Sequence, residues 1–404
     1  MLPHPLLPPR YRSLLLAALL LAGLFFSRAL LSLLMAKGLL LLLFPSFRQL
    51  FFARFGKPFG WLTAGIIIWY LYQLLADPSV YTLQRMLFHG SLLSCWCLLF
   101  FLEVSSARVT VLILLAGVLS CLPSLVDFWQ RPELGSLYEK GQVARTLLKG
   151  DHQRFSIWIS GCLGLSWWVF LRENKKWAIG FTAFFSLFLL VFSVRTGWLF
   201  LLLVTLFAAV FFFLEHWSWR KGLAGLAILL LMGIVAFRVP FVRSKIQYTI
   251  WEQREQKQSL ALAGSDAVRL AVNKTAFSLI QEQPGGYGSA VAKTVLHAKL
   301  EIKHPGLPVK YQWPFSQYLQ WWLVAGYFFG SLPLLALLFL LYLLLRKKHL
   351  FTVLWTFFIA LTCLYESTLE QQYGLFLAAF FGFIFLFKDT NRFGVRPSPD
   401  QLIR

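Results

Sequence analysis

Residues 177–214 read WAIGFTAFFSLFLLVFSVRTGWLFLLLVTLFAAVFFFL, and Arg195 is the only charged residue in this stretch. A helix that crosses a membrane needs about 20 mostly apolar residues, because the hydrocarbon core is about 30 Å thick. Its backbone polar groups must also be satisfied within the segment, since the surrounding lipid offers no hydrogen bonds. The stretch therefore predicts two membrane-spanning helices, at 177–193 and 196–214, that meet close to Arg195.

Similar apolar runs occur along the whole chain of 404 residues, of which 58% are hydrophobic and only 14% charged. A soluble protein of this length has too little interior to bury so much apolar surface. The sequence predicts an all-α integral membrane protein with about twelve spanning helices. Their expected positions are 12–26, 30–44, 59–75, 85–102, 108–126, 156–171, 177–193, 196–214, 221–239, 320–345, 350–366 and 371–387.

The basic residues gather in short loops, and this predicts the orientation of the chain. Twelve alternating spans place four basic loops on the same side as both termini. By the positive-inside rule that side is the cytoplasm. The net charge of +21 lies largely in loops between spans, and basic loops of this kind attract anionic lipid. We therefore expect membrane lipid, and no nucleic acid, as a partner. The loops contain Arg48, Arg54 and Lys57; Arg172, Lys175 and Lys176; Arg220 and Lys221; and Arg346, Lys347 and Lys348.

The resulting organisation has nine spans in residues 1–239, a long outer loop at 240–319, three spans in 320–388 and a cytoplasmic tail at 389–404. The loop contains an apolar pattern at helical spacing from Val268 to Ile280, which ends at Pro284-Gly285-Gly286. The start of the chain predicts a retained first helix. The five cysteines all lie in or beside apolar runs, so we expect them to be buried and unpaired.

Arg195 is the first candidate for chemistry, because it lies between two apolar runs near the predicted outer boundary of the membrane. An ionisable residue at such a place is a functional hypothesis by default. A guanidinium group matches the oxygens of a phosphate-bearing lipid head group. The alternative is an interfacial arginine whose side chain reaches water.

Further candidates lie in three outward-facing segments. Arg269 lies on the predicted loop helix, before a turn whose backbone N–H groups are positioned to approach an anion. Two other polar segments adjoin spans on the same side, and each has an ordinary loop as its alternative. The candidate residues of these segments are Gly286, Tyr287 and Gly288 in the turn; His152 and Arg154 before a span; and Glu366 and Glu370 between the last two spans.

Several classes of chemistry find no support in the sequence. It contains no phosphate-binding loop of the GxxxxGK[ST] type, no zinc-ligand spacing and no acidic cluster that would cage a metal ion. We therefore expect no cofactor and no metal. Chemistry on the outer face without a nucleotide predicts a pre-activated donor that is carried on a lipid.

Four groups of residues resemble the bacterial O-antigen ligase family, within the O-antigen ligase/polymerase superfamily. The segment Ser193-Val194-Arg195-Thr196-Gly197-Trp198 resembles the family's motif at the start of a span. Arg269 with Pro284-Gly285-Gly286-Tyr287-Gly288 resembles its arginine, apolar helix and Pro-x-x-Gly-x-Gly turn. Ser316-Gln317-Tyr318-Leu319, followed by Gly326 and Gly330, is similar to the entry into the next span. His152-x-Arg154 and Glu366-x-Thr368-Leu369-Glu370-x-Gln372 resemble motifs of one branch of ligases.

The resemblance implies a GT-C-like glycosyltransferase architecture with one long periplasmic loop, in the bacterial inner membrane. It implies that a glycan passes from undecaprenyl pyrophosphate to a hydroxyl of the lipid A-core or a similar acceptor, with inversion and without metal. Arg195, Arg269 and Arg154 would bind the diphosphate, together with the glycine turn. His152, Ser316, Gln317, Tyr318, Glu366 and Glu370 would support the acceptor. A polymerase of the same superfamily and a lipid-linked glycan transporter are the alternatives.

The chain departs from the family at one position, because Phe315-Ser316 stands where the family has His-Asn. That histidine is the family's proposed base or acceptor-positioning group. His297 or His304 in the same loop are candidates to replace it, as are Glu366 and Glu370. A different acceptor or a loss of activity is the remaining alternative.

Overall fold

The structure is a computed structural model. It describes residues 9–41, 43–76, 78–99, 102, 106–131, 145–148, 151–192, 195–216, 238, 243, 247, 250, 265–305, 313–370 and 372–391. All the regular elements in these residues are helices. The predicted span at 221–239 lies outside the described residues, apart from Arg238.

The first half of the chain contains α1 (Pro9–Phe26), α2 (Arg28–Leu41), α3 (Pro45–Ala76), α4 (Val80–Leu99), α5 (Ala107–Gln130), α7 (His152–Glu173), α8 (Ala178–Phe192) and α9 (Arg195–His216). The second half contains α12 (Ser265–Glu282), α13 (Ala292–Lys303), α14 (Gln317–Gly330), α15 (Leu332–Arg346), α16 (Leu350–Tyr365), the 3₁₀ turn η2 (Thr368–Glu370) and α17 (Gln372–Asn391).

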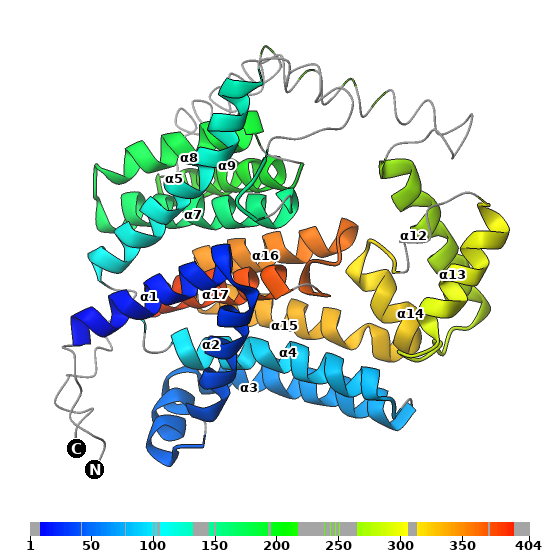
Figure 1. Ribbon diagram of the computed structural model, residues 1–404. Helices are drawn as coiled ribbons and strands as arrows, with labels where there is room; N and C mark the ends of the chain where they lie inside the picture. Colours follow the sequence, from blue (N-terminus) through cyan, green and yellow to red (C-terminus); the bar gives the residue numbers. More distant parts are fainter. Residues whose placement is uncertain are drawn as a thin grey trace.

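Helix α17 lies at the centre of the main hydrophobic core, against α16, α7 and α4 (Figure 1). Its phenylalanines pack at tilted angles against buried rings of these neighbours, such as Trp158 of α7 and Trp355 of α16. Helices α12, α13 and α14 form a separate group at one end of the molecule (Figure 1), around a second core that includes Val272, Leu296 and Leu323.

The lengths and composition of the helices are those of a membrane protein. Among the described residues, α5, α7 and residues Gln372–Asp389 of α17 are each long and apolar enough to cross a membrane. Shorter apolar helices lie at Ser13–Phe26, Ala178–Phe192, Thr196–Phe207 and Leu350–Tyr365, which are positions of predicted spans. The count of about twelve spans and the GT-C-like architecture stay predictions.

The expected single span at 320–345 is broken into two helices, α14 and α15, which are bent by 73°. Gly326 inside α14 has a φ of 74°, which ends regular helical geometry there. Pro333 lies in the first turn of α15, where its missing N–H costs nothing and its fixed φ starts a new helix. The hydropathy of the stretch does not reveal this break, because both halves are apolar.

The loop helix and the cysteines agree with the sequence. Helix α12 covers the predicted pattern and buries Val268, Val272, Ala276 and Ile280 on one face. All five cysteines are buried thiols.

Candidate functional site

Polar side chains from distant segments meet where α16 ends and α7 begins. Glu366 follows the last residue of α16, and its side chain accepts hydrogen bonds from Gln153 and from Arg269. Arg154 makes an ion pair with the same carboxylate, with 3.8 Å between Nη2 and Oε2. The structure thus brings together three predicted residues, Arg154, Arg269 and Glu366. We call Gln153, Arg154, Arg269, Phe315 and Glu366 the Glu366 cluster.

The start of α7 fixes the orientation of Arg154. Asp151 caps this helix by accepting a hydrogen bond from the Arg154 backbone N–H at 3.1 Å. The same carboxylate oxygen lies 3.3 Å from Nη1 of the Arg154 side chain, which also donates to Gln153 Oε1 at 3.2 Å. Only 6% of Arg154 is exposed. A buried guanidinium held from two sides needs little reorganisation before it binds an anion. His152 lies on the same first turn of the helix.

Arg269 extends from α12 and lies over the ring of Phe315, with 4.8 Å between the guanidinium carbon and the ring centroid. Phe315 is therefore in the cluster, at the position where the resembled family has its histidine. Asn273, one turn after Arg269, accepts hydrogen bonds from the backbone N–H groups of Phe315 (2.9 Å) and Ser316 (3.5 Å). Asn273 thereby fixes the backbone of Phe315, and with it the position of the ring under Arg269. Asn273 was not among the residues predicted from the sequence.

Arg195 is the first residue of α9, but its side chain lies outside the described part of the structure. The next residue, Thr196, is buried and its side chain lies beside the Tyr365 hydroxyl. Tyr365 directly precedes Glu366. The start of α9 therefore adjoins the Glu366 cluster, as the prediction for Arg195 requires, while the role of its guanidinium stays a prediction.

Glu370 lies one short turn after Glu366 and forms a second polar centre. It makes an ion pair with Arg85 of α4, and the Gln317 side chain donates to it at 2.7 Å. His89 Nε2 lies 3.6 Å from the carboxylate, and the other ring nitrogen of His89 contacts the Tyr70 hydroxyl. Arg85 and His89 were missed by the sequence analysis. The signal was present, because two ionisable residues one turn apart begin an otherwise apolar span.

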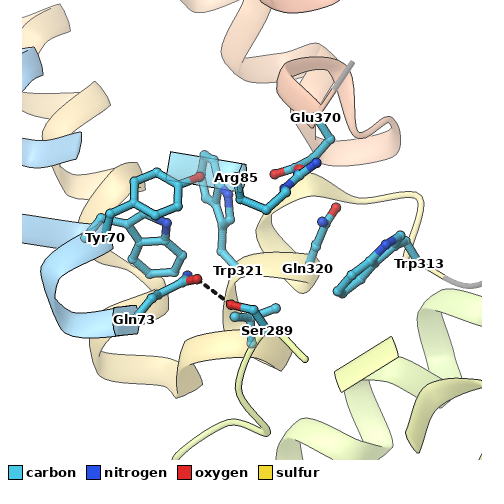
Figure 2. A pocket seen from close by; sticks show the side chains of 10 residues that line it. Tyr70, Gln73, Arg85, Ser289, Trp313, Gln320, Trp321 and Glu370 are labelled. Atoms are coloured by element: carbon cyan, nitrogen blue, oxygen red, sulfur yellow. Dashed lines mark hydrogen bonds and ion pairs between the residues drawn. The ribbon is translucent and has the colours of Figure 1, made fainter. Parts of the chain in front are cut away.

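A pocket opens beside Glu370, between α3, α4, α14 and the turn before α13 (Figure 2). We call it the Glu370 pocket. Ser289 donates a hydrogen bond to Gln73 Oε1 at 2.6 Å on one wall (Figure 2). The pocket is lined by Trp69, Tyr70, Gln73, Arg85, Ser289, Trp313, Gln320, Trp321, Val324 and Glu370.

The glycine turn does not offer its backbone to an anion, which corrects the prediction for Gly286, Tyr287 and Gly288. The N–H groups of these three residues donate to the carbonyl oxygens of Gln283, Leu323 and Val324 at 2.9–3.0 Å. The turn is thus joined to the kinked part of α14. Gly286 has a φ of 84°, and a Cβ there would lie 2.4 Å from the backbone nitrogen of Gly326. The turn requires glycine because two backbones touch.

The loop histidines do not join the cluster. His297 lies on α13, 3.7 Å from Glu301 one turn later, and His304 ends the same helix. Burial, and then the charge of Lys303, lower the pKa of His304 from its ordinary value. Among the described residues, neither histidine forms a hydrogen bond or ion pair with the Glu366 cluster. Tyr318 is likewise used in packing, because its hydroxyl donates to the Ala360 carbonyl at 2.8 Å.

Residues 180–334 match the family model described as O-antigen ligase. The match covers less than half of the chain, and it shows that this region is similar to the O-antigen ligase family. The members of this family are glycosyltransferase-like enzymes. The matched region includes Arg195, Arg269 and Phe315, whereas Arg154, Glu366 and the Arg85–Glu370 pair lie outside it. Comparison of the chain with curated proteins gives no match.

Proposed function

We propose that this chain transfers a glycan from undecaprenyl pyrophosphate to a hydroxyl of an acceptor such as the lipid A-core. The observation that carries the proposal is the convergence of buried Arg154 and half-buried Arg269 on Glu366, in a chain whose residues 180–334 match the O-antigen ligase family model. A lipid-linked donor presents its diphosphate at the membrane surface. Guanidinium groups bind phosphate oxygens through paired N–H donors without the help of a metal ion.

The chemistry asks the protein to stabilise a leaving group. The acceptor oxygen forms a bond with the anomeric carbon while the bond from that carbon to the diphosphate oxygen breaks, so the anomeric centre is inverted. Negative charge grows on the diphosphate in the transition state, and prearranged arginines stabilise it there. Glu366 is a positioning residue, because it holds both guanidinium groups in place before the donor arrives. Arg269 Nε is buried and has no hydrogen-bond partner among the described residues, so a donor remains for phosphate.

The acceptor hydroxyl must lose its proton, and a carboxylate of the 366–370 turn is the proposed recipient. Phe315 cannot take a proton, and His297 and His304 interact locally on α13. Both carboxylates are connected to the start of α14. Glu366 accepts a hydrogen bond from Arg269, which lies over Phe315, and Glu370 accepts one from Gln317. Each carboxylate already pairs with a cation, Glu366 with Arg269 and Glu370 with Arg85.

The proposed location is the outer, periplasmic face of the bacterial inner membrane, with both termini in the cytoplasm. Helix α7 begins at the Glu366 cluster, and Arg172 and Lys175 lie at its other end. Helix α16 begins after Lys347 and Lys348 and ends at the cluster. The basic loops are thus at the opposite end of these helices from Glu366. The positive-inside rule places those loops in the cytoplasm and the cluster outside.

A strain that lacks the gene tests the proposal, by gel analysis of surface lipopolysaccharide together with the lipid-linked pool. Core lipid without repeats, beside full-length glycan on the carrier, is the expected result. Core lipid with a single repeat would identify a polymerase instead. An unchanged pattern would overturn both assignments for this polysaccharide.

A purified system separates an enzyme from a transporter. Full-length protein in nanodiscs is mixed with carrier-linked glycan and core lipid on the same side of the membrane. A glycosyltransferase forms glycan-bearing core lipid under these conditions, because nothing has to cross a bilayer. A transporter gives no product.

A further inference from the structure

His89 is an ionisable side chain within the apolar helix α4, and a residue of this kind is a functional hypothesis by default. Its Nε2 is buried and forms no hydrogen bond within the described part of the chain. Glu370 Oε1 lies 3.6 Å from this nitrogen. A buried nitrogen without a hydrogen-bond partner reduces stability, so a role other than folding explains it best.

The other ring nitrogen of His89 decides where the ring carries its hydrogen. Nδ1 lies 3.1 Å from the carbonyl oxygen of Arg85, one turn earlier, and it also contacts the Tyr70 hydroxyl. A carbonyl oxygen only accepts hydrogen bonds, so this contact assigns the hydrogen to Nδ1. A second cation beside the Arg85 guanidinium would be costly in this buried place, so the ring is neutral. Nε2 therefore presents a lone pair to Glu370.

The surroundings of Glu366 offer no comparable acceptor. Its Oε1 accepts hydrogen bonds from Gln153 and Arg269, and Arg154 pairs with its Oε2. All of these contacts are donors or cations. If Glu366 took a proton, the new O–H would find no acceptor among them.

Glu370 has donors on one side and an acceptor on the other. Arg85 makes an ion pair with it (Figure 2), and Gln317 donates to its Oε1 at 2.7 Å. The lone pair of His89 Nε2 faces the same Oε1. While Glu370 is ionised, two acceptors face each other there. Once Glu370 carries a proton, its O–H can donate to Nε2, and the unfavourable contact becomes a hydrogen bond.

We propose that Glu370, and not Glu366, takes the proton of the acceptor hydroxyl, and that His89 is the residue that positions Glu370 for this step. The acceptor oxygen bonds to the anomeric carbon, and the bond from that carbon to the diphosphate oxygen breaks, with its electron pair going to the diphosphate. The hydroxyl proton moves to Glu370, which then donates a hydrogen bond to neutral His89. A histidine thus takes part although Phe315 occupies the loop position.

The space beside Glu370 suits this step. It measures about 20 Å³, which is room for one water-sized group such as a hydroxyl. The proposed diphosphate site is adjacent, because Gln317 donates to Glu370 while Phe315, two residues earlier, lies under Arg269. This inference rests on the proposed function and names the groups that would serve its acceptor.

The charges around Glu370 decide how a pH profile is interpreted. Arg85 pairs with Glu370, Gln317 is neutral, and Tyr70 of α3 contacts the far side of His89. In the same turn, Glu366 is paired with Arg154 and Arg269. Arg28 of α2 lies over the Tyr373 ring at 4.7 Å. A shift in the profile on substitution of His89 therefore reports on Glu370.

Glycan transfer by full-length protein in nanodiscs, with kcat and KM measured across pH, tests the assignment. His89→Phe fills the site without a lone pair. We expect its kcat to fall about tenfold, the effect of one hydrogen bond, with KM unchanged for both substrates. The acid limb of the kcat profile should move to lower pH, because protonated Glu370 loses its acceptor. His89→Gln, whose amide oxygen accepts a hydrogen bond, should recover part of the rate.

Three further variants complete the test. Glu370→Gln removes the proposed proton acceptor and should lower kcat by a factor of about 10²–10⁴. Glu366→Gln should mainly raise KM for the lipid-linked glycan, because it loosens the two arginines. Gln84→Phe, at an exposed position of α4, is the matched control and should keep both the rate and the profile. Size-exclusion chromatography restricts each measurement to folded protein.

The outcomes separate this inference from the proposed function. Transfer by the wild type with an unchanged kcat and profile in His89→Phe overturns the inference alone. Equal losses in His89→Phe and His89→Gln, with the acid limb in place, assign His89 to packing and also overturn it. A larger fall of kcat in Glu366→Gln than in Glu370→Gln has the same consequence. Absence of transfer by the wild type overturns both proposals.

Discussion

Both ends of the α7–α16–α17 packing bury carboxylates, but the two ends use them differently. At the end away from Glu366, Asp389 of α17 accepts hydrogen bonds from the backbone N–H (3.1 Å) and hydroxyl (2.9 Å) of Thr352 and from Trp168 Nε1 (3.3 Å). Lys388 pairs with Glu173 at 3.0 Å and lies over the Trp168 ring. We call these five residues the Asp389 cluster.

The Asp389 cluster is saturated, whereas the Glu366 end is not. Each polar atom of Asp389 has a donor, and one of those donors is a backbone N–H in the first turn of α16 that would otherwise be unsatisfied. At the Glu366 end, Arg269 Nε and the amide oxygens of Gln317 and Gln320 are buried without a partner within the described residues.

This difference separates polar groups that stabilise a fold from polar groups that await a ligand. A buried network in which every polar group has a partner makes the structure rigid and unique, and it has no donor or acceptor left for a ligand. A network with unused donors and acceptors costs stability until something binds. The comparison therefore predicts that changes at the Glu366 end reduce transfer, while changes at the Asp389 end reduce stability.

The largest effect is expected for Arg269→Ala. Removal of one prearranged donor from a developing anion typically costs a factor of about 10²–10³ in rate, and we expect a loss of this size in glycan transfer by reconstituted protein. Arg269→Lys should recover only part of the rate, because a lysine keeps the charge but loses the forked N–H donors.

Two controls test whether the loss of transfer in Arg269→Ala is a specific effect and not a loss of folding. A thermal unfolding curve of Arg269→Ala should stay close to that of the wild type, since 27% of the side chain is exposed. Lys299→Ala is the matched control, because Lys299 on the neighbouring α13 makes an exposed ion pair with Glu282 of α12, and such pairs contribute less than about 1 kcal/mol. Transfer by Arg269→Ala at the rate of Lys299→Ala would contradict the role of the cluster.

Gly326→Ala is expected to reduce both glycan transfer and stability, because Gly326 lies where α14 contacts the turn that follows α12. Gly326 has φ 74° and ψ 177°, a region almost restricted to glycine, which costs a residue with a side chain about 1–3 kcal/mol. A Cβ here would also lie 2.3 Å from the Pro284 carbonyl oxygen, and overpacking adds at least about 1 kcal/mol. We expect a loss of about 2–3 kcal/mol in the free energy of unfolding, together with weaker transfer as Phe315 and Arg269 lose their spacing.

Gly180→Ala in α8 is the control for this substitution. A Cβ at Gly180 would meet no atom within 4 Å, so the variant should be at least as stable as the wild type. Equal unfolding midpoints for the two variants would show that the contact between the turn and α14 does not constrain the fold.

The sequence predicted those parts of the molecule that depend on local pattern. Apolar runs located α8, α9 and α16, and the spacing of Val268 to Ile280 located the buried face of α12. The local patterns alone gave Arg154, Arg269 and Glu366 as separate outward-facing charges, and only the resemblance implied that the two arginines act on one diphosphate. Their meeting at one point depends on packing between segments more than 90 residues apart, which no local pattern encodes.

The errors have the same origin. The glycine turn has the composition of an anion-binding loop, but the N–H groups of Tyr287 and Gly288 donate to α14, 36 residues later, and that of Gly286 donates to Gln283. Arg85 and His89 were predicted only as part of the apolar span 85–102, because their partner, Glu370, is distant in sequence. The kink inside α14 lies at Gly326, which faces Gly286, and hydropathy does not record such a contact.

Asp389→Ala tests the saturated end of the comparison. It removes three hydrogen bonds and leaves a backbone N–H of α16 without its acceptor, so we expect a loss of about 1–3 kcal/mol in the free energy of unfolding. Glycan transfer per folded molecule should stay within twofold of the wild type, since Asp389 lies at the opposite end of α17 from Glu370. A tenfold loss of transfer in fully folded protein would show that the two ends are coupled.

Phe315→Ala is expected to give the smallest effect and to sharpen the comparison most, because it changes one contact within the Glu366 cluster. The ring supports Arg269 through a cation–π contact of 4.8 Å, and such contacts contribute about 0.5–1 kcal/mol. That energy corresponds to a rise of about two- to fivefold in KM for the lipid-linked glycan, with little change in kcat, since the ring orients an arginine and accepts no proton. Phe357→Ala, at an exposed position of α16, is the control. A fall of 100-fold or more in kcat for Phe315→Ala alone would assign the ring to the reacting centre and remove the carboxylates of the 366–370 turn from their proposed role.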